Sequence, residues 1–160
     1  MGGVKEATVM ARRGAEGITW SAQTAVAAYG MPKATDESKW PVLNGSAFRI
    51  VPYGALAIDR TSGAHKGRIY VAYFDFEAGV GNVMLSFSDD GKAWSRPVNI
   101  GDAPQFDQFL PAVGGGPDGT VDARWLDRRD DPPHHLSDAD SGYSLHGEAW
   151  WPMNRPGPPG

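Results

Sequence analysis

The sequence predicts an all-β fold of short antiparallel strands, and three observations support this prediction. Apolar residues occur in short runs rich in β-branched and aromatic side chains, whereas helical periodicity is hard to find. Glycine, proline and aspartate cluster between these runs as turn signals. The 21 glycines and 13 prolines make up about a fifth of the chain, which many tight turns would require and which stays below the roughly 25–30% typical of disorder.

Taken in order along the chain, the predicted strands are residues 8–11, 49–51, 68–74, 82–87 and 120–126. Each is short and contains β-branched or aromatic residues. Turns are predicted at 63–67, 89–91 and 117–119, where glycine stands beside charged or small residues. The Ala-rich segment 21–29 fits a helix, but its Thr24, Val26 and Tyr29 fit a strand equally well.

Composition and charge exclude several classes of partner. A net charge of −4 and a pI near 5.5 leave no basic surface, so no nucleic acid is expected. No apolar run approaches the roughly 18 residues of a membrane helix, so no membrane partner is expected. The chain has no cysteine and therefore no disulfide, and residues 1–5 lack the apolar stretch of a secretion signal. If the parent protein is exported, its signal is expected to lie outside this sequence.

Internal repetition favours a propeller over a sandwich. Residues 68–75 align with 120–127 at an offset of 52 positions, and 88–94 align with 144–150 at an offset of 56. A third copy, 17–21, follows the first predicted strand. A repeat of 52–56 residues with four short strands is typical of an antiparallel propeller blade.

The predicted units are about 8–30, 48–101 and 106–151, which amounts to about two and a half blades. An incomplete set leaves open sheet edges, so the missing blades are expected from a parent chain or from self-association. The Pro/Gly-rich tail 152–160 is expected to be disordered.

The middle copy, Ser88-Asp89-Asp90-Gly91-Lys92-Ala93-Trp94, resembles the Asp box of sialidases and related propellers, with Ala93 in place of the usual threonine. The resemblance spans about residues 8–151. Its structural residues here are Ser88, Asp90, Gly91 and Trp94. We expect the Asp90 carboxylate to accept backbone N–H groups, Gly91 to adopt a positive φ, and Trp94 to fold back between strands. The other two copies are degenerate.

The resemblance implies that the parent is a sialidase-like glycoside hydrolase, secreted or extracytoplasmic, that removes terminal sialic acid or a related sugar. The family clamps the substrate carboxylate with three arginines and uses an aspartate as acid/base. Arg49, in Phe48-Arg49-Ile50-Val51-Pro52, is similar to one clamp arginine, although Val51 is an insertion that changes the strand register. The alternative is an ordinary surface arginine.

Asp130 and Asp131 are the candidate acid residues, because they follow the second strand of their unit as the family's acid loop does. Arg128 and Arg129 beside them are candidate substrate ligands. The alternative is a solvated charged loop. The family places clamp and acid in one blade, whereas here Arg49 and Asp130 fall in consecutive units, so this chain alone is expected to be inactive.

A second function remains open, namely a non-catalytic Asp-box scaffold that binds a glycan or a protein. Tyr143 and Glu148 do not match the family's nucleophile motif. The polar residues around 134–146 fit no metal-ligand spacing, so neither a metal nor another cofactor is expected.

Overall fold

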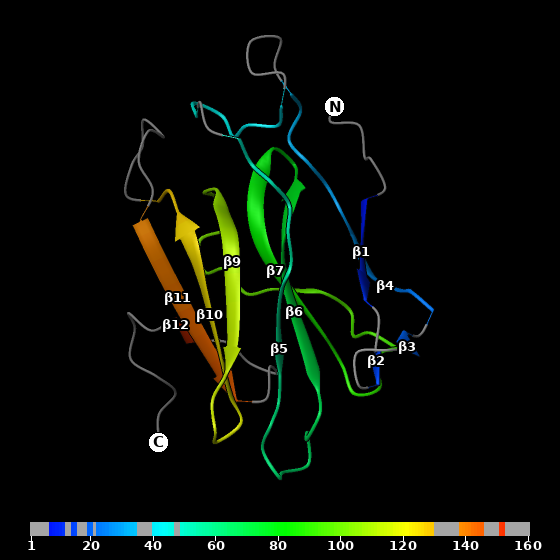
Figure 1. Cartoon of the computed structure of the whole chain (residues 1–160). Helices are drawn as coiled ribbons and strands as arrows, with labels where there is room; N and C mark the ends of the chain where they lie inside the picture. Colours follow the sequence, from blue (N-terminus) through cyan, green and yellow to red (C-terminus); the bar gives the residue numbers. More distant parts are fainter. Residues whose placement is uncertain are drawn as a thin grey trace.

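The computed structural model describes residues 7–11, 14–15, 19–20, 22–34, 40–46, 49–129, 138–145 and 151–152 (Figure 1). These ranges form strands and turns without a helix. The strands are β1 (Ala7–Ala11), β2 (Gly14–Ala15), β3 (Thr19–Trp20), β4 (Thr24–Tyr29), β5 (Ala55–Ile58), β6 (Ile69–Glu77), β7 (Val80–Ser88), β8 (Val98–Asn99), β9 (Gln108–Gly115), β10 (Thr120–Asp127), β11 (Asp138–Leu145) and β12 (Trp151–Pro152). Within the described ranges, no helical segment could span a lipid bilayer.

All strand pairs are antiparallel, which confirms the predicted all-β class for the described part of the chain. Two four-stranded sheets have the order β5-β6-β7-β8 and β9-β10-β11-β12, so each strand pairs with its neighbour along the chain. Two smaller sheets, β1–β4 and β2–β3, precede them. In the Ala-rich segment for which helix and strand fitted equally well, residues 24–29 form a strand, β4.

The register of the two large sheets confirms the sequence alignment. In the first sheet Ile69 of β6 pairs with Ser88 of β7, and in the second Val121 of β10 pairs with Ser144 of β11. These two pairs are related by the same offsets, 52 and 56 positions, that align the sequence. Equivalent positions of the two central strand pairs, β6–β7 and β10–β11, thus have equivalent neighbours.

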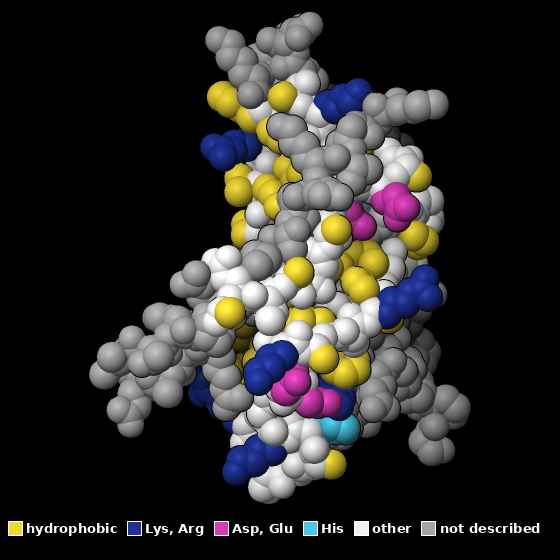
Figure 2. Space-filling model, turned by 90° about the vertical axis from the view of Figure 1, so that its right-hand side faces the viewer, with side chains coloured by type: hydrophobic (Ala, Val, Ile, Leu, Met, Phe, Trp, Pro, Cys, Tyr) yellow, Lys and Arg dark blue, Asp and Glu magenta, His cyan; other side chains and the backbone are white. Residues whose placement is uncertain are grey.

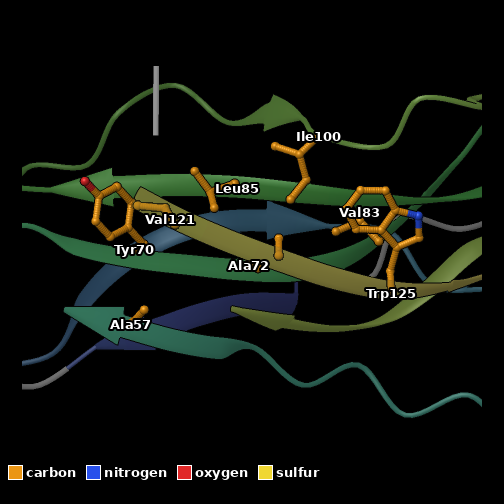
Figure 3. Packing of buried hydrophobic residues seen from close by; sticks show 9 residues of the cluster. Ala57, Tyr70, Ala72, Val83, Leu85, Ile100, Val121 and Trp125 are labelled. Atoms are coloured by element: carbon orange, nitrogen blue, oxygen red, sulfur yellow. The ribbon is translucent and has the colours of Figure 1, made fainter. Parts of the chain in front are cut away.

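Strand β6 is buried on both faces, which explains its nearly continuous apolar sequence. Tyr70 and Ala72 point toward the second sheet, where they pack with residues of β7 and β10 such as Leu85 and Val121 (Figure 3). The alternate residues of β6 pack on the other face against Val26 of β4. Each fully buried side chain of this size stabilises the fold by about 1.5–3 kcal/mol. Three layers therefore stack in the order β1–β4, β5–β8, β9–β12.

A second hydrophobic cluster contains residues of the loop before β5 and corrects one predicted strand. Leu43, Ile50, Phe74 and Phe109 form this cluster. Residues 49–51 were predicted as a strand, but they form a loop whose Ile50 N–H donates to the Pro41 carbonyl at 2.9 Å. Since proline has no N–H for a ladder, the strand begins only after Pro52, at β5.

The other predicted strands are confirmed: they correspond to β1, β6, β7 and β10. The predicted turns at 63–67, 89–91 and 117–119 also lie between strands. The candidate acids Asp130 and Asp131, and the tail from 153 onward, lie outside the described residues.

Candidate functional site

The Asp-box turn joins β7 to β8, the third and fourth strands of the first sheet. The Asp90 carboxylate accepts the N–H groups of Lys92 at 2.8 Å and Ala93 at 2.9 Å, and it also accepts the Ser88 hydroxyl at 3.1 Å. Ser88 Oγ in turn accepts the Gly91 N–H at 2.8 Å, and Gly91 has a φ of 71°. Both expectations for Asp90 and Gly91 are confirmed.

These bonds also set the charge of the turn. The backbone N–H groups of Lys92 and Ala93 lower the pKa of the Asp90 carboxyl, because they stabilise its ionised form. Asp90 therefore accepts hydrogen bonds as a carboxylate at neutral pH. The Asp90 side chain is exposed, and its hydrogen bonds stabilise the turn locally.

Trp94 is partly buried and packs against the cluster formed by Val26 of β4 and by Val71 and Tyr73 of β6. The Thr24 hydroxyl of β4 donates to the Gly91 carbonyl at 3.1 Å. The Asp-box turn thus helps to hold the β1–β4 layer against the first sheet. This role is structural and places no chemistry at the turn.

Arg68, the residue before β6, binds the same turn through Asp89. Its Nε and Nη2 donate to the Asp89 carboxylate at 2.6 and 3.1 Å, and its guanidinium lies 4.4 Å from the centre of the Phe87 ring. The hydrogen bond from Arg68 lowers the pKa of Asp89. Figure 2 shows acidic and basic side chains together with a histidine at this lower end of the molecule.

The opposite end of the sheets holds a group that we call the carboxylate–arginine cluster. Its members come from the β8–β9 connection, the start of β9 and the end of β10. They are Asp102, Asp107, Gln108, Asp127, Arg128 and Arg129. Asp107 accepts the Gly81 N–H at the start of β7, so the cluster lies one strand length, roughly 23 Å, from the Asp-box turn.

Arg129 is bound to two carboxylates. Its Nη1 donates to Asp102 at 3.1 Å and its Nη2 contacts the other Asp102 oxygen, so the two side chains form a bidentate pair. The same Nη2 donates to Asp127 at 2.5 Å. The hydrogen bonds to Asp102 and Asp127 raise the pKa of Arg129, which is therefore charged at every pH of interest. The Arg129 side chain is 22% exposed.

Asp127, at the end of β10, is the most highly connected carboxylate of the cluster. Its oxygens accept the Gln108 amide at 2.6 Å and the Arg129 backbone N–H at 2.7 Å, in addition to the guanidinium. Burial raises the pKa of this carboxyl, but the bonds from Arg129 and Gln108 outweigh burial, and the net pKa is lowered.

Arg128 points the other way and is 1% exposed. Its Nη1 donates to Asp107 at 3.2 Å and to the Asn44 carbonyl at 2.9 Å. Asp107 accepts the Gly81 N–H at 2.9 Å through its other oxygen. Arg128 therefore joins three segments: the loop at 40–46, the first sheet through Asp107, and the end of β10.

The structure places the predicted ligand-binding arginines in different settings. Arg49 is exposed on the loop before β5. Arg128 and Arg129 direct their planar forks at the protein's own carboxylates, the groups that a substrate carboxylate would have to replace. A role of these three arginines in ligand binding stays a prediction, as does the role of Asp130 and Asp131 outside the described residues.

Sequence reasoning missed Asp102, Asp107 and Gln108 as site residues. One sequence signal did point to a structural role of Asp127: it aligns with Asp75 in the repeat. The Asp75 carboxylate accepts the N–H of Gly30, the residue after β4, at 2.6 Å. In both sheets, an aspartate near the end of the second strand thus accepts hydrogen bonds, Asp75 from Gly30 and Asp127 from Gln108 and Arg129.

Within the described part of the chain, no group of three or more histidine or acidic side chains could hold a metal ion. No family model, curated protein or solved structure matches the chain.

Proposed function

We propose that β5–β8 and β9–β12 are successive blades of an Asp-box propeller resembling those of sialidases. The intact box supports this proposal most strongly, because its Ser88 and Asp90 bonds close the turn between the third and fourth strands of a four-stranded sheet. The equal strand order, the equivalent register and the face-to-face packing of the two sheets agree with it. The β1–β4 pair is the outer part of a preceding blade.

The parent of this architecture is a sialidase-like glycoside hydrolase acting on terminal sialic acid or a related sugar. This chain contributes scaffold to it and does not hydrolyse sialosides alone. Catalysis of that type needs arginine forks that are free to receive a carboxylate. The forks of Arg128 and Arg129 are instead occupied by Asp102, Asp107 and Asp127.

The same occupancy favours a second candidate, a non-catalytic propeller that binds a glycan or protein on its surface. Exposed Arg49 is then one contact among several on the binding face. The two candidates differ in turnover by the complete parent, since both allow binding and neither expects this chain alone to cleave a sugar.

The purified chain should be assayed on a fluorogenic sialoside while its mass in solution is measured by light scattering. We expect no turnover above the buffer control. Turnover by a monomer, abolished by Asp130→Asn or Asp131→Asn but kept in Asp118→Asn, would refute the scaffold assignment. Glycan-array binding that Arg49→Ala abolishes would support a binding face at Arg49, and only turnover by the complete parent would decide between the two candidates.

A further inference from the structure

We infer that Asn44 is a site of spontaneous deamidation and backbone isomerisation, and that this modification loosens the buried anchor of Arg128. The inference does not depend on the proposed function. Asn44 and Gly45 are exposed at the centre of a tight turn, which the Ser46 N–H closes on the Leu43 carbonyl at 3.0 Å. Gly45 has a φ of 68°, the conformation that glycine takes at the third position of such a turn.

The turn leaves both reacting groups accessible. Among the described residues, no hydrogen bond holds the Gly45 N–H or the Asn44 side-chain amide. Glycine has no Cβ to obstruct the approach of its nitrogen to the preceding side chain. Asparagine is itself one of the chemically labile residues.

The reaction is balanced with water as its only co-reactant. The Gly45 nitrogen attacks Cγ of Asn44, a new C–N bond forms, and the side-chain amide nitrogen leaves as ammonia with the proton lost from Gly45. Water then opens the resulting five-membered imide at either carbonyl. One opening gives aspartate at position 44, and the other gives isoaspartate, in which the main chain runs through the side-chain carbon.

The consequence follows from the position of the Asn44 carbonyl. This oxygen accepts Nη1 of Arg128 at 2.9 Å, and Arg128 is 1% exposed. In isoaspartate the main chain runs through Cγ and is one carbon longer, so this carbonyl becomes part of a free α-carboxylate that the turn no longer holds against Arg128. Arg128 Nη2 already has no hydrogen-bond partner among the described residues, so loss of the carbonyl leaves Asp107 alone to hold this buried charge. Leu43, which is 1% exposed, is the adjoining core residue.

The chain contains two internal controls. Asn82 and Asn99 lie in β7 and β8, where the Asn99 amide donates to the Asn82 side-chain oxygen at 3.0 Å. Each is followed by a β-branched residue, Val83 or Ile100, whose side chain crowds the attacking nitrogen. We therefore expect the reaction at Asn44 and not at these two asparagines.

The full chain should be incubated at mildly alkaline pH and physiological temperature, then digested and analysed by mass spectrometry with an isoaspartate-specific methylation assay. Among Asn44, Asn82 and Asn99, we expect isoaspartate at position 44 alone. If Asn44 reacts no faster than Asn82 and Asn99, the inference fails. Asn44→Gln should abolish the reaction, because its longer side chain would have to close a less favourable six-membered ring.

The link to Arg128 needs a second readout. Aged wild-type protein should melt at least roughly 2 °C below fresh protein, whereas aged and fresh Asn44→Gln should melt alike. Fresh Asn44→Asp carries the new charge without the altered main chain, so it should melt close to fresh wild type. Equal melting of aged and fresh wild type, with isoaspartate present, would overturn the coupling to Arg128.

Discussion

At one end of the β5–β8 sheet, the carboxylate of Asp90 holds backbone N–H groups of its own turn, whereas at the other end the carboxylates of Asp107 and Asp127 hold two arginines. The first carboxylate is exposed and its partners are two or three residues away. The others are buried, and although Arg129 is two residues from Asp127, Asp107 binds Arg128 21 positions away and Asp127 also binds Gln108 19 positions away. The exposed turn is therefore encoded locally, and the buried cluster depends on the packed sheets.

This difference sets the energetic consequences. An exposed carboxylate that loses a partner is resolvated by water, whereas a buried charge that loses a partner stays uncompensated. Substitutions in the carboxylate–arginine cluster should therefore destabilise the chain more than substitutions in the Asp-box turn. Four predictions test this ranking, from the largest expected effect to the smallest.

Arg128→Ala should lower the free energy of unfolding by about 3–5 kcal/mol, because it leaves Asp107 buried without its charged partner. Urea unfolding followed by tryptophan fluorescence measures this loss. Arg49→Ala, at an exposed arginine, is the control and should change stability by less than about 0.5 kcal/mol. Equal effects of the two variants would contradict the ranking.

Asp127→Asn should cost about 1.5–3 kcal/mol at neutral pH, because Arg129 and Gln108 both bind its charged form. The pKa of Asp127 is lowered in the folded chain, so its contribution is complete above the unfolded pKa of about 3.9 and is lost as pH falls through the folded pKa. Stability measured against pH should therefore fall less steeply below about pH 4 in the variant. If the stability of wild type and of the variant fell equally steeply below about pH 4, the role of this carboxylate would be contradicted.

Gly101→Ala should destabilise the chain by about 2 kcal/mol, the cost of one hydrogen bond to a charged group. A Cβ at Gly101 would lie 1.7 Å from the Gln108 side-chain oxygen, and Gln108 is fully buried. The side chain can move away only by releasing Asp127. Thermal unfolding measures the loss, and Gly114→Ala, where a Cβ meets nothing within 4 Å, is the matched control.

Gly91→Ala should have the smallest effect, about 1 kcal/mol. A Cβ there meets no atom closer than 3.6 Å, so the cost is only the strain of a positive φ. A loss as large as that of Arg128→Ala would show that the exposed Asp-box turn matters as much as the buried cluster. Melting curves of the two variants compare the two ends of the sheet directly: Gly101→Ala, beside the carboxylate–arginine cluster, should melt lower than Gly91→Ala, in the Asp-box turn.

Local features of the sequence predicted most of what is local in the fold. Short runs of β-branched and aromatic residues predicted β6, β7 and β10, and the spacing from Ser88 to Trp94 predicted the turn with its Asp90 bonds. The prediction of a strand at 49–51 was wrong, because Pro52 interrupts the ladder of hydrogen bonds. Ile50 instead lies in a loop and packs with Leu43, Phe74 and Phe109.

The cluster could not be predicted in the same way. Arg128 binds a carbonyl 84 positions away and Arg129 binds a carboxylate 27 positions away, and no spacing rule connects such partners. The adjacent arginines were interpreted through the resemblance as possible substrate ligands. Their actual partners depend on how the β8–β9 connection folds over the end of β10, which only the packed sheets determine.

The central claim is that Arg128 links the two sheets. A double-mutant cycle of Arg128→Met and Asp107→Asn, measured by urea unfolding of both single variants and the double variant, tests it most directly. We predict a coupling free energy of about 2 kcal/mol, with the double variant much more stable than the sum of the single losses implies. A coupling below about 0.5 kcal/mol would contradict the account, because the two side chains would then act independently.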